Sequence, residues 1–260
     1  MKALVTGASS GLGKDFAIQL SEMGYDLILV ARRKDRLEEL KKALKTNVEI
    51  IPLDLSSTFN CAKLFDKVKD EDIDILINNA GFGIASNFVE SNLEKELDMI
   101  DLNVKTVHTL TKYFLQKFND KNKGYILNVA SSAAFQPGPL MATYYATKSY
   151  VYSLTMAISE ELRKENSKVY IGCLCPGPVD TEFNKVANVE FTVPSLKSSD
   201  VVKYALKKMF KRKLVIIPGA LMKVSYFFTK ISPLKLKLKI AYKIQKSKMK
   251  SWQKRNLTLL

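Results

Sequence analysis

Short apolar runs alternate with longer periodic runs along the first 217 residues. Continuous apolar runs of this kind are typical of buried strands, and apolar residues that recur every three or four positions are typical of helices. Strands are predicted at Lys2–Thr6, Asp26–Ala31, Val48–Leu53, Ile73–Ile77, Tyr125–Ala130, Val169–Leu174 and Leu214–Ile217. Helices are predicted after the first strand and at Arg36–Leu44, Phe59–Lys69, Leu93–Phe118, Met141–Arg163 and Ser199–Phe210. The alternation predicts an α/β fold, a doubly wound, Rossmann-like parallel sheet with helices on both faces.

A glycine-rich segment joins the first strand to the first helix, and its sequence is Gly7-Ala8-Ser9-Ser10-Gly11-Leu12-Gly13. Glycines let the backbone approach a pyrophosphate closely, and a helix N-terminus offers unpaired N–H groups and a positive dipole end. The spacing is Gly-x-x-x-Gly-x-Gly rather than the commoner Gly-x-Gly-x-x-Gly. A strand, this loop and a helix in that order predict a site for the phosphates of a dinucleotide.

The second predicted strand ends at Arg32 and Arg33. In a dinucleotide-binding fold this strand end meets the adenosine ribose, where a carboxylate binds the 2′-hydroxyl and an arginine accommodates a 2′-phosphate. The two arginines therefore favour NADP(H) over NAD(H). The alternative is a solvated basic turn, and Asp35 lies close enough to weaken the predicted preference for NADP(H).

Other motifs also follow predicted strand ends. They are Asp54-Leu55, Asn78-Asn79-Ala80-Gly81, Ser131-Ser132 and the segment from Cys175 to Thr181. In a parallel sheet the carboxyl ends of the strands lie at one edge, and ligands bind there where the strand order reverses. We expect these motifs to line one site.

Tyr144 and Lys148 lie one helical turn apart in the predicted helix Met141–Arg163. An ammonium beside a phenol favours the phenolate, so we expect Lys148 to lower the pKa of Tyr144 from about 10 toward working pH. Such a tyrosine can protonate a carbonyl or accept a proton from an alcohol. Alone, a Tyr-x-x-x-Lys pattern is common by chance, and its meaning depends on the other motifs.

The net charge of +15 is concentrated at one end of the chain. Residues 201–260 hold 17 Lys/Arg and no Asp or Glu, whereas the preceding residues hold 24 basic and 26 acidic residues. Charge without a recognised binding module does not indicate nucleic acid. With three cysteines and one histidine we expect no disulfide framework and no metal site. No secretory leader or spanning run is apparent, so we expect a cytoplasmic protein.

The C-terminal residues 218–260 form a predicted helical extension to a catalytic domain at residues 1–217. Ser232-Pro233 resembles a helix start. Beyond it, one side of the helix carries Leu234, Leu238, Ala241, Tyr242, Met249 and Trp252, and another carries Lys235, Lys239, Lys243, Lys246 and Lys250. A basic amphipathic helix suggests an anionic membrane surface, which would place the protein at the inner membrane face. The alternative is a packed helix with a solvated lysine face.

Taken in order, these motifs resemble the short-chain dehydrogenase/reductase family over at least residues 1–181. The matching residues are Thr6 to Gly13, Asn78 to Gly81, Asn103, Ser131, Tyr144, Lys148, Pro176, Gly177 and Thr181. Ser131 precedes Tyr144 by the family's thirteen residues. Ser132 has the same spacing to Tyr145, but Tyr145 is followed by Ser149 where the family has its lysine.

The resemblance implies a catalytic tetrad of Asn103, Ser131, Tyr144 and Lys148. Tyr144 would be the general acid or base, Lys148 would also hold the nicotinamide ribose, Ser131 would stabilise the substrate oxygen, and Asn103 would position Lys148 through water. The implied contacts to the cofactor are Gly7, Ser9, Ser10, Gly11, Leu12, Gly13, Arg32, Arg33, Asp54, Leu55, Asn79, Ala80, Gly81, Tyr144, Lys148, Pro176, Gly177, Val179 and Thr181.

The expected function is that of an NADPH-dependent carbonyl reductase or alcohol dehydrogenase. The segment from Glu182 to about Ser198 contains Phe183, Val186, Val189, Phe191 and Val193, which suggests an apolar substrate or only a covered core. A 3-oxoacyl thioester reductase is the alternative enzyme, and a catalytically silent dinucleotide-binding scaffold is the alternative of another class. The resemblance also implies a homodimer or homotetramer.

Overall fold

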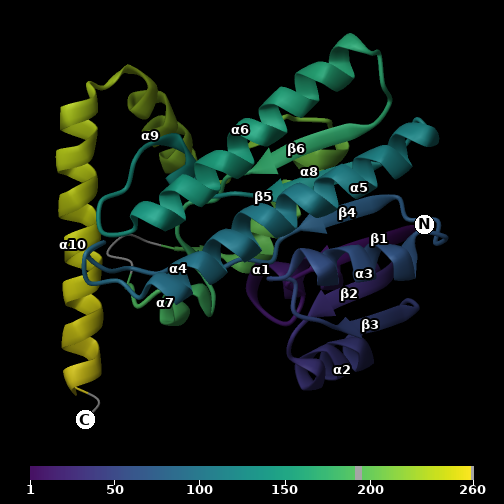
Figure 1. Ribbon diagram of the computed structural model, residues 1–260, viewed down its shortest axis with the longest axis horizontal. Coiled ribbons are helices and arrows are strands. Elements are labelled where there is room, and N and C mark those ends of the chain that lie inside the picture. The colour runs from purple at the N-terminus through teal and green to yellow at the C-terminus, as the bar shows by residue number, and fades with distance from the viewer. Residues whose placement is uncertain (191–194, 259–260) are drawn as a thin grey trace.

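A seven-stranded parallel sheet forms the centre of the described part of the chain, in the order β3-β2-β1-β4-β5-β6-β9 (Figure 1). The computed structural model describes residues 1–190 and 195–258, without the side chains of Lys250 and of the residues after Ser251. The strands of the sheet are β1 (Lys2–Thr6), β2 (Asp26–Ala31), β3 (Val48–Pro52), β4 (Ile75–Asn78), β5 (Tyr125–Val129), β6 (Tyr170–Leu174) and β9 (Val215–Ile216). The predicted doubly wound sheet is therefore confirmed.

Helices cover both faces of this sheet. The α-helices in the described part of the chain are α1 (Gly11–Glu22), α2 (Lys34–Ala43), α3 (Thr58–Val68), α4 (Leu93–Ile100), α5 (Val107–Asp120), α6 (Ala142–Lys164), α7 (Phe183–Val186), α8 (Ser198–Phe210), α9 (Ala220–Ile231) and α10 (Leu234–Thr258). A further pair of short strands, β7 (Val179–Asp180) and β8 (Leu196–Lys197), lies outside the main sheet.

The alternation of side chains along each strand divides the core into two layers. In β1, Val5 packs with residues of α1, α2 and α8, whereas Leu4 packs with residues of α3, α5 and α6. Successive side chains of a strand point to opposite faces, so a sheet covered on both faces needs continuously apolar strands. This explains why the apolar runs identified the strands so well.

The strand order reverses at β1, whose neighbours are β2 on one side and β4 on the other. The loops after β1 and β4 therefore diverge to opposite faces and leave a crevice at the carboxyl edge. The predicted glycine loop follows β1 and the motif Asn78–Gly81 lies at the end of β4, so both border this crevice.

The predicted helix Leu93–Phe118 is not a single α-helix. A π-helical turn at Asp101–Thr106 separates α4 from α5, and it contains Asn103. Such turns are rare and frequently lie at functional sites. The periodicity of apolar residues over Leu93–Phe118 indicates a helix, but it does not reveal the single π-helical turn within it.

The C-terminal segment, predicted as a helical extension, contains α9 followed by the predicted helix α10. The hydroxyl of Ser232 donates to the carbonyl of Phe228, so Ser232 ends α9 instead of capping α10. In Figure 1, α10 stands at the edge of the molecule, beside α4 and α7. Among the described residues, no helix combines the length and apolar composition needed to span a bilayer.

The cysteines and the histidine lie away from any metal-binding arrangement. Cys61, Cys173 and Cys175 are buried free thiols. His108 forms a hydrogen bond between its Nδ1 and the hydroxyl of Tyr150 at 2.7 Å. Within the described ranges, no three His, Cys, Asp or Glu side chains gather as metal ligands would.

Candidate active site

A cavity of about 790 Å³ opens at the carboxyl edge of the sheet. The structure brings nearly all the predicted site residues to its wall. They are Gly7, Ser9, Ser10, Gly11, Leu12, Arg32, Arg33, Asp54, Leu55, Asn79, Ala80, Gly81, Ser131, Tyr144, Lys148, Pro176, Gly177, Val179 and Thr181. Gly13 and Asn103 are the predicted residues that do not line the cavity, and both are buried behind it.

The glycine loop packs so closely against the loop after β4 that side chains are excluded. A Cβ on Gly7 would lie 2.8 Å from the Cα of Ala80, and Gly7 has a φ of +66°. A Cβ on Gly13 would lie 2.2 Å from the carbonyl oxygen of Gly7. The hydroxyl of Thr6 accepts hydrogen bonds from the N–H groups of Asn79 and Ala80, at 3.0 and 3.1 Å. These contacts keep bare backbone at the cavity wall.

The N-terminus of α1 fits the phosphates of a dinucleotide. Ser10 occupies the N-cap position, but its side chain makes no capping hydrogen bond, and no acidic residue lies in the first turn. The first turn of the helix therefore has no carboxylate of its own, and its N–H groups carry the positive end of the dipole. Thr181 lies over this end, since its Cγ2 is 3.1 Å from the position of a Cβ on Gly11.

The two arginines after β2 have different surroundings. Arg33 donates hydrogen bonds to the hydroxyls of Ser9 and Ser10 and forms an ion pair with Glu182 at 2.9 Å. Arg32 is largely exposed and lies 3.8 Å from Asp54. Glu182 also pairs with Arg36, and the hydrogen bonds from Arg36 and then Arg33 lower its pKa to about 2. The pairing of Glu182 spans more than 140 residues and left no sequence signal.

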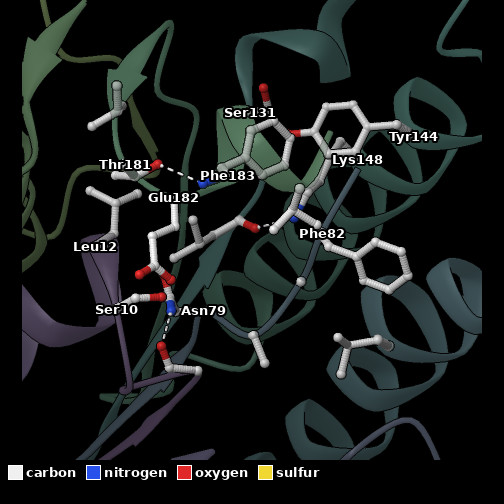
Figure 2. Close-up of a pocket in the computed structure, with 18 of the residues that line it drawn as sticks. Ser10, Leu12, Asn79, Phe82, Ser131, Tyr144, Lys148, Thr181, Glu182 and Phe183 are labelled. Carbon is white, nitrogen blue, oxygen red and sulfur yellow. Dashed lines mark hydrogen bonds between the residues drawn. The ribbon is translucent and has the colours of Figure 1, made fainter. Parts of the chain in front are cut away.

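Ser131, Tyr144 and Lys148 gather at the other end of the cavity from Ser10 and Asn79 (Figure 2). Ser131 follows β5, while Tyr144 and Lys148 come from successive turns of α6. The ammonium of Lys148 lies 5.9 Å from the centroid of the Tyr144 ring and donates to the carbonyl of Val129 at 3.0 Å. The structure thus brings together three of the four predicted catalytic side chains.

The expected lowering of the Tyr144 pKa is not found. Burial raises the pKa of Tyr144 well above 10, although a hydrogen bond with the Ser131 hydroxyl acts in the opposite direction. Burial also lowers the pKa of Lys148 from 10.5 to about 8. Both side chains are nearly inaccessible, at 8% and 5% exposure, so loss of solvent disfavours phenolate and ammonium alike. Burial therefore favours the neutral phenol of Tyr144.

Asn103 lies behind the catalytic side chains within the π-helical turn. Its amide donates to the carbonyl of Phe82 and to the hydroxyl of Thr147, and its Oδ1 accepts from the N–H of Phe82. Gly81 lies against both Asn103 and Lys148, because a Cβ there would lie 2.7 Å from Oδ1 of Asn103 and 3.4 Å from Nζ of Lys148. Asn103 thereby holds the loop after β4 against the helix that carries Lys148.

Apolar side chains surround the cavity beside Tyr144. Phe183, Val186 and Val189 line it as expected, whereas residues 191–194 lie outside the described part of the chain. Side chains that sequence reasoning missed complete this wall, namely Phe82, Ile84, Met141, Tyr145, Gln245 and Lys248. Gln245 belongs to α10, is 2% exposed and donates to the hydroxyl of Tyr145. No local pattern in the sequence links α10 to this wall.

Comparisons with known proteins agree with this arrangement. The family model for short chain dehydrogenases matches residues 1–190. An uncharacterized oxidoreductase of Staphylococcus epidermidis is 36% identical over 188 residues, which cover 70% of this chain and 80% of that protein. An NADP-dependent 3-hydroxy acid dehydrogenase of Schizosaccharomyces pombe is 33% identical over 84% of this chain and 90% of that protein. A very-long-chain 3-oxoacyl-CoA reductase of Danio rerio is 28% identical over 74% and 64%.

Solved structures show the same fold. A short-chain dehydrogenase from Sphingobium yanoikuyae in complex with NADPH is 30% identical, with a TM-score of 0.78 over 89% of this chain and 96% of that one. A bulky-bulky ketone specific alcohol dehydrogenase from Comamonas testosteroni is 28% identical, with a TM-score of 0.75 over 89% and 94%. A family member from Burkholderia phymatum in complex with NAD, at 24% identity and a TM-score of 0.79 over 86% and 90%, shows the fold alone.

The fold and the site define an oxidoreductase of the Rossmann type that binds a nicotinamide cofactor. The chain belongs to the short-chain dehydrogenase/reductase family.

Proposed function

We propose that this protein is an NADPH-dependent carbonyl reductase that also runs in reverse as an alcohol dehydrogenase. Its substrate would be a small to medium, apolar carbonyl compound or alcohol. The observation that carries the proposal is the cavity itself, with the glycine loop at one end and Ser131, Tyr144 and Lys148 at the other. The apolar side chains beside Tyr144 support an apolar substrate.

In the proposed reaction, Tyr144 and Ser131 act on the substrate oxygen. Bound NADPH supplies the hydride that the carbonyl carbon receives. Tyr144 donates its phenolic proton to the oxygen, and the hydroxyl of Ser131 donates a hydrogen bond that stabilises the charge building there. The buried, neutral phenol suits the reductive direction, in which a proton donor is needed. Lys148 holds the nicotinamide ribose, and Asn103 positions Lys148 through the Gly81 loop and water.

The preference for NADP(H) is supported by the arginines after β2. Arg32 and Arg33 line the cavity near Asp54 and Leu55, where the adenosine end of a dinucleotide would lie. A guanidinium matches a phosphate with two donors. The relative from Schizosaccharomyces pombe is NADP-dependent by name, which supports the same preference.

The proposal is tested by Tyr144→Phe, which removes the phenolic proton and keeps the ring. We expect NADPH to bind as before and turnover to fall roughly 10²–10⁴-fold. The matched control is Tyr145→Phe, which removes the neighbouring hydroxyl that contacts Gln245 and should keep most of the turnover. The rate of NADPH consumption with an apolar ketone is compared among wild type, Tyr144→Phe and Tyr145→Phe. Turnover of Tyr144→Phe within tenfold of wild type would remove Tyr144 from the proposed role.

A 3-oxoacyl thioester reductase is the second candidate, because a relative bears the name very-long-chain 3-oxoacyl-CoA reductase. NADPH consumption against a panel of ketones, aldehydes and 3-oxoacyl thioesters distinguishes the candidates. A kcat/KM for thioesters far above that for ketones would favour the second candidate. If no compound of the panel leads to NADPH consumption although NADPH still binds, a catalytically silent scaffold is favoured instead.

The quaternary structure and the division of the chain are proposals of the same kind. We infer a homodimer or homotetramer, formed through the long helices that contain Asn103 and Tyr144. We also infer a catalytic domain at residues 1–217 with a helical extension at residues 218–260.

A further inference from the structure

The outward face of α9 is apolar along its whole length. Leu221, Val224, Phe227, Phe228 and Ile231 are between 53% and 65% exposed. Their spacing of three or four residues, with Phe227 and Phe228 adjacent, places them on one side of the helix. We call these five residues the α9 face. Single exposed apolar side chains are ordinary, but a contiguous group on one helix marks an interaction site.

The opposite side of α9 is fixed against the body of the protein. The side chain of Met222 fills the space beside Gly177, where a Cβ would lie 2.2 Å from its sulfur. The ring of Tyr226 lies 4.3 Å from that of Phe135. Since these contacts hold the helix from behind, α9 cannot rotate to bury the α9 face without leaving the body.

A second exposed apolar stripe follows on α10. Leu236, Ile240 and Ile244 are spaced four apart and are 44–48% exposed, and Leu234 at the start of the helix is 56% exposed. The other side of α10 is buried at Ala241 and Gln245. The stripe differs from the predicted one, in which Leu234 and Tyr242 share a side with Ala241. Tyr242 is 43% exposed, and Trp252 lies outside the described side chains.

Lysines surround these apolar side chains. Between Ala220 and Met249 the chain has eight lysines and no acidic residue. Lys223 and Lys230 flank the α9 face and lie over the rings of Tyr204 and Tyr226, at 5.3 and 4.5 Å. In the described part of the chain, no carboxylate pairs with a lysine from Lys223 to Lys246.

The positive charge of this surface favours an anionic bilayer over a second copy of the chain as its binding partner. A second copy of the chain would bring the same lysines face to face, and like charges in contact disfavour that association. An anionic bilayer accepts apolar side chains at its interface and attracts the lysines around them. Because no described helix can span a bilayer, the contact would lie in the plane of the surface.

We propose that the α9 face, with Leu234 and the lysines that flank it, docks this protein on an anionic membrane surface. Phe227, Phe228 and Ile231 enter the interface, and the lysines of α9 and α10 contact the lipid headgroups. The same two helices reach the active site from their inner sides, through Met222 at Gly177 and through Gln245 at Tyr145. The proposed membrane-binding surface and the cavity are therefore bordered by the same two helices. The proposal does not depend on which substrate the cavity accepts.

The test is cosedimentation of the full-length protein with vesicles of phosphatidylcholine, with or without 30 mol% phosphatidylglycerol. We expect binding to the anionic vesicles, at least tenfold weaker binding to the neutral ones, and loss of binding in 0.5 M salt. Phe227→Ser/Phe228→Ser/Ile231→Ser should weaken binding to anionic vesicles at least tenfold. The matched control is Phe59→Ser/Phe88→Ser/Val89→Ser, which alters apolar side chains elsewhere that are at least as exposed and should bind as wild type.

NADPH binding shows that each variant is folded, and sedimentation velocity reports its assembly. Failure of the wild type to bind anionic vesicles would overturn the proposal, as would equal losses in the two triple variants. If the α9 variant dissociates a larger assembly while its vesicle binding is unchanged, the α9 face is a subunit interface and the proposal is wrong.

Discussion

At the scale of single residues, burial determines the electrostatics of the site. Tyr144 and Lys148 lie where the sequence predicted, one turn apart on α6, but burial raises the pKa of Tyr144 instead of Lys148 lowering it. Sequence spacing gives the distance between two side chains, but it does not give the water they lose on folding. That loss depends on the loops after β4 and β5, which lie over Lys148 from distant parts of the chain.

The buried lysine should lower the stability of the protein. Lowering the pKa of Lys148 from 10.5 to about 8 corresponds to about 3 kcal/mol of unfolding free energy. Lys148→Met should remove that cost and so raise the free energy of unfolding. The loss of the hydrogen bond to Val129 should lower it again by about 1 kcal/mol. We therefore expect an inactive enzyme that is about 2 kcal/mol more stable at pH 7.

This gain should depend on pH in a definite direction. Below about pH 8 the lysine is charged in both the folded and the unfolded chain, so the full cost is present. Between pH 8 and 10.5 the unfolded chain binds more protons, so the wild type gains stability as pH rises and the advantage of Lys148→Met disappears. Urea unfolding at pH 7, 9 and 10.5 measures this, with the exposed Lys112→Met as control. A constant difference across the three pH values would contradict the assignment.

Arg32 and Arg33 should contribute differently to cofactor preference. Arg32→Asp places a carboxylate at the end of β2 and should shift preference from NADPH toward NADH. Arg33→Ala should weaken both cofactors, because Arg33 also holds Ser9 and Ser10 of the glycine loop. The ratio of kcat/KM with NADPH to kcat/KM with NADH, measured for wild type and for each variant, reports the cofactor preference. An unchanged ratio in Arg32→Asp would exclude Arg32 as the contact to the 2′-phosphate.

At the scale of elements, the segment after β7 is tied to the start of α2. Glu182 holds Arg33 and Arg36 by ion pairs, and its pKa of about 2 keeps it ionised at any working pH. A 2′-phosphate would compete with this carboxylate for the same guanidinium groups.

Glu182→Gln should therefore favour the phosphorylated cofactor. We expect the Kd for NADPH to fall several-fold and the Kd for NADH to change less than twofold, as measured by fluorescence titration. Glu38→Gln, which removes an exposed ion pair with Lys34 on α2, provides the control. Weaker NADPH binding in Glu182→Gln would mean that Glu182 orients Arg33 for the phosphate rather than competing with it.

At the scale of the whole molecule, the sequence predicts the sheet and the strand-end motifs far better than the substrate end of the cavity. Each strand is a local apolar run, so its position and its motif can be read from consecutive residues. Gln245 meets Tyr145 across a hundred residues, and Glu182 meets Arg36 across 146, so no local pattern indicates either contact. α9 had no predicted bounds of its own within the helical extension because its exposed side is apolar, so the usual contrast between an apolar and a polar face is absent.

The C-terminal helix should matter for substrate and not for cofactor. Gln245→Ala removes the hydrogen bond to Tyr145 and opens the wall opposite the glycine loop. We expect KM for the carbonyl substrate to rise several-fold while the Kd for NADPH stays within twofold. Lys246→Ala, on the exposed side of the same helix, should change neither. Equal effects on substrate and NADPH would show that α10 supports the whole fold instead of this wall.

The π-helical turn at Asp101–Thr106 sets the rotational phase between α4 and α5. Each residue of an α-helix advances the side chain by about 100°, so one residue more in a turn rotates everything before it by that amount. Met99 faces the cluster around Tyr144 only because of this offset. An unbroken α-helix of the same sequence would turn Met99 away from the active site, whereas deleting one residue within the turn would restore the α-helix and keep Met99 on its present side.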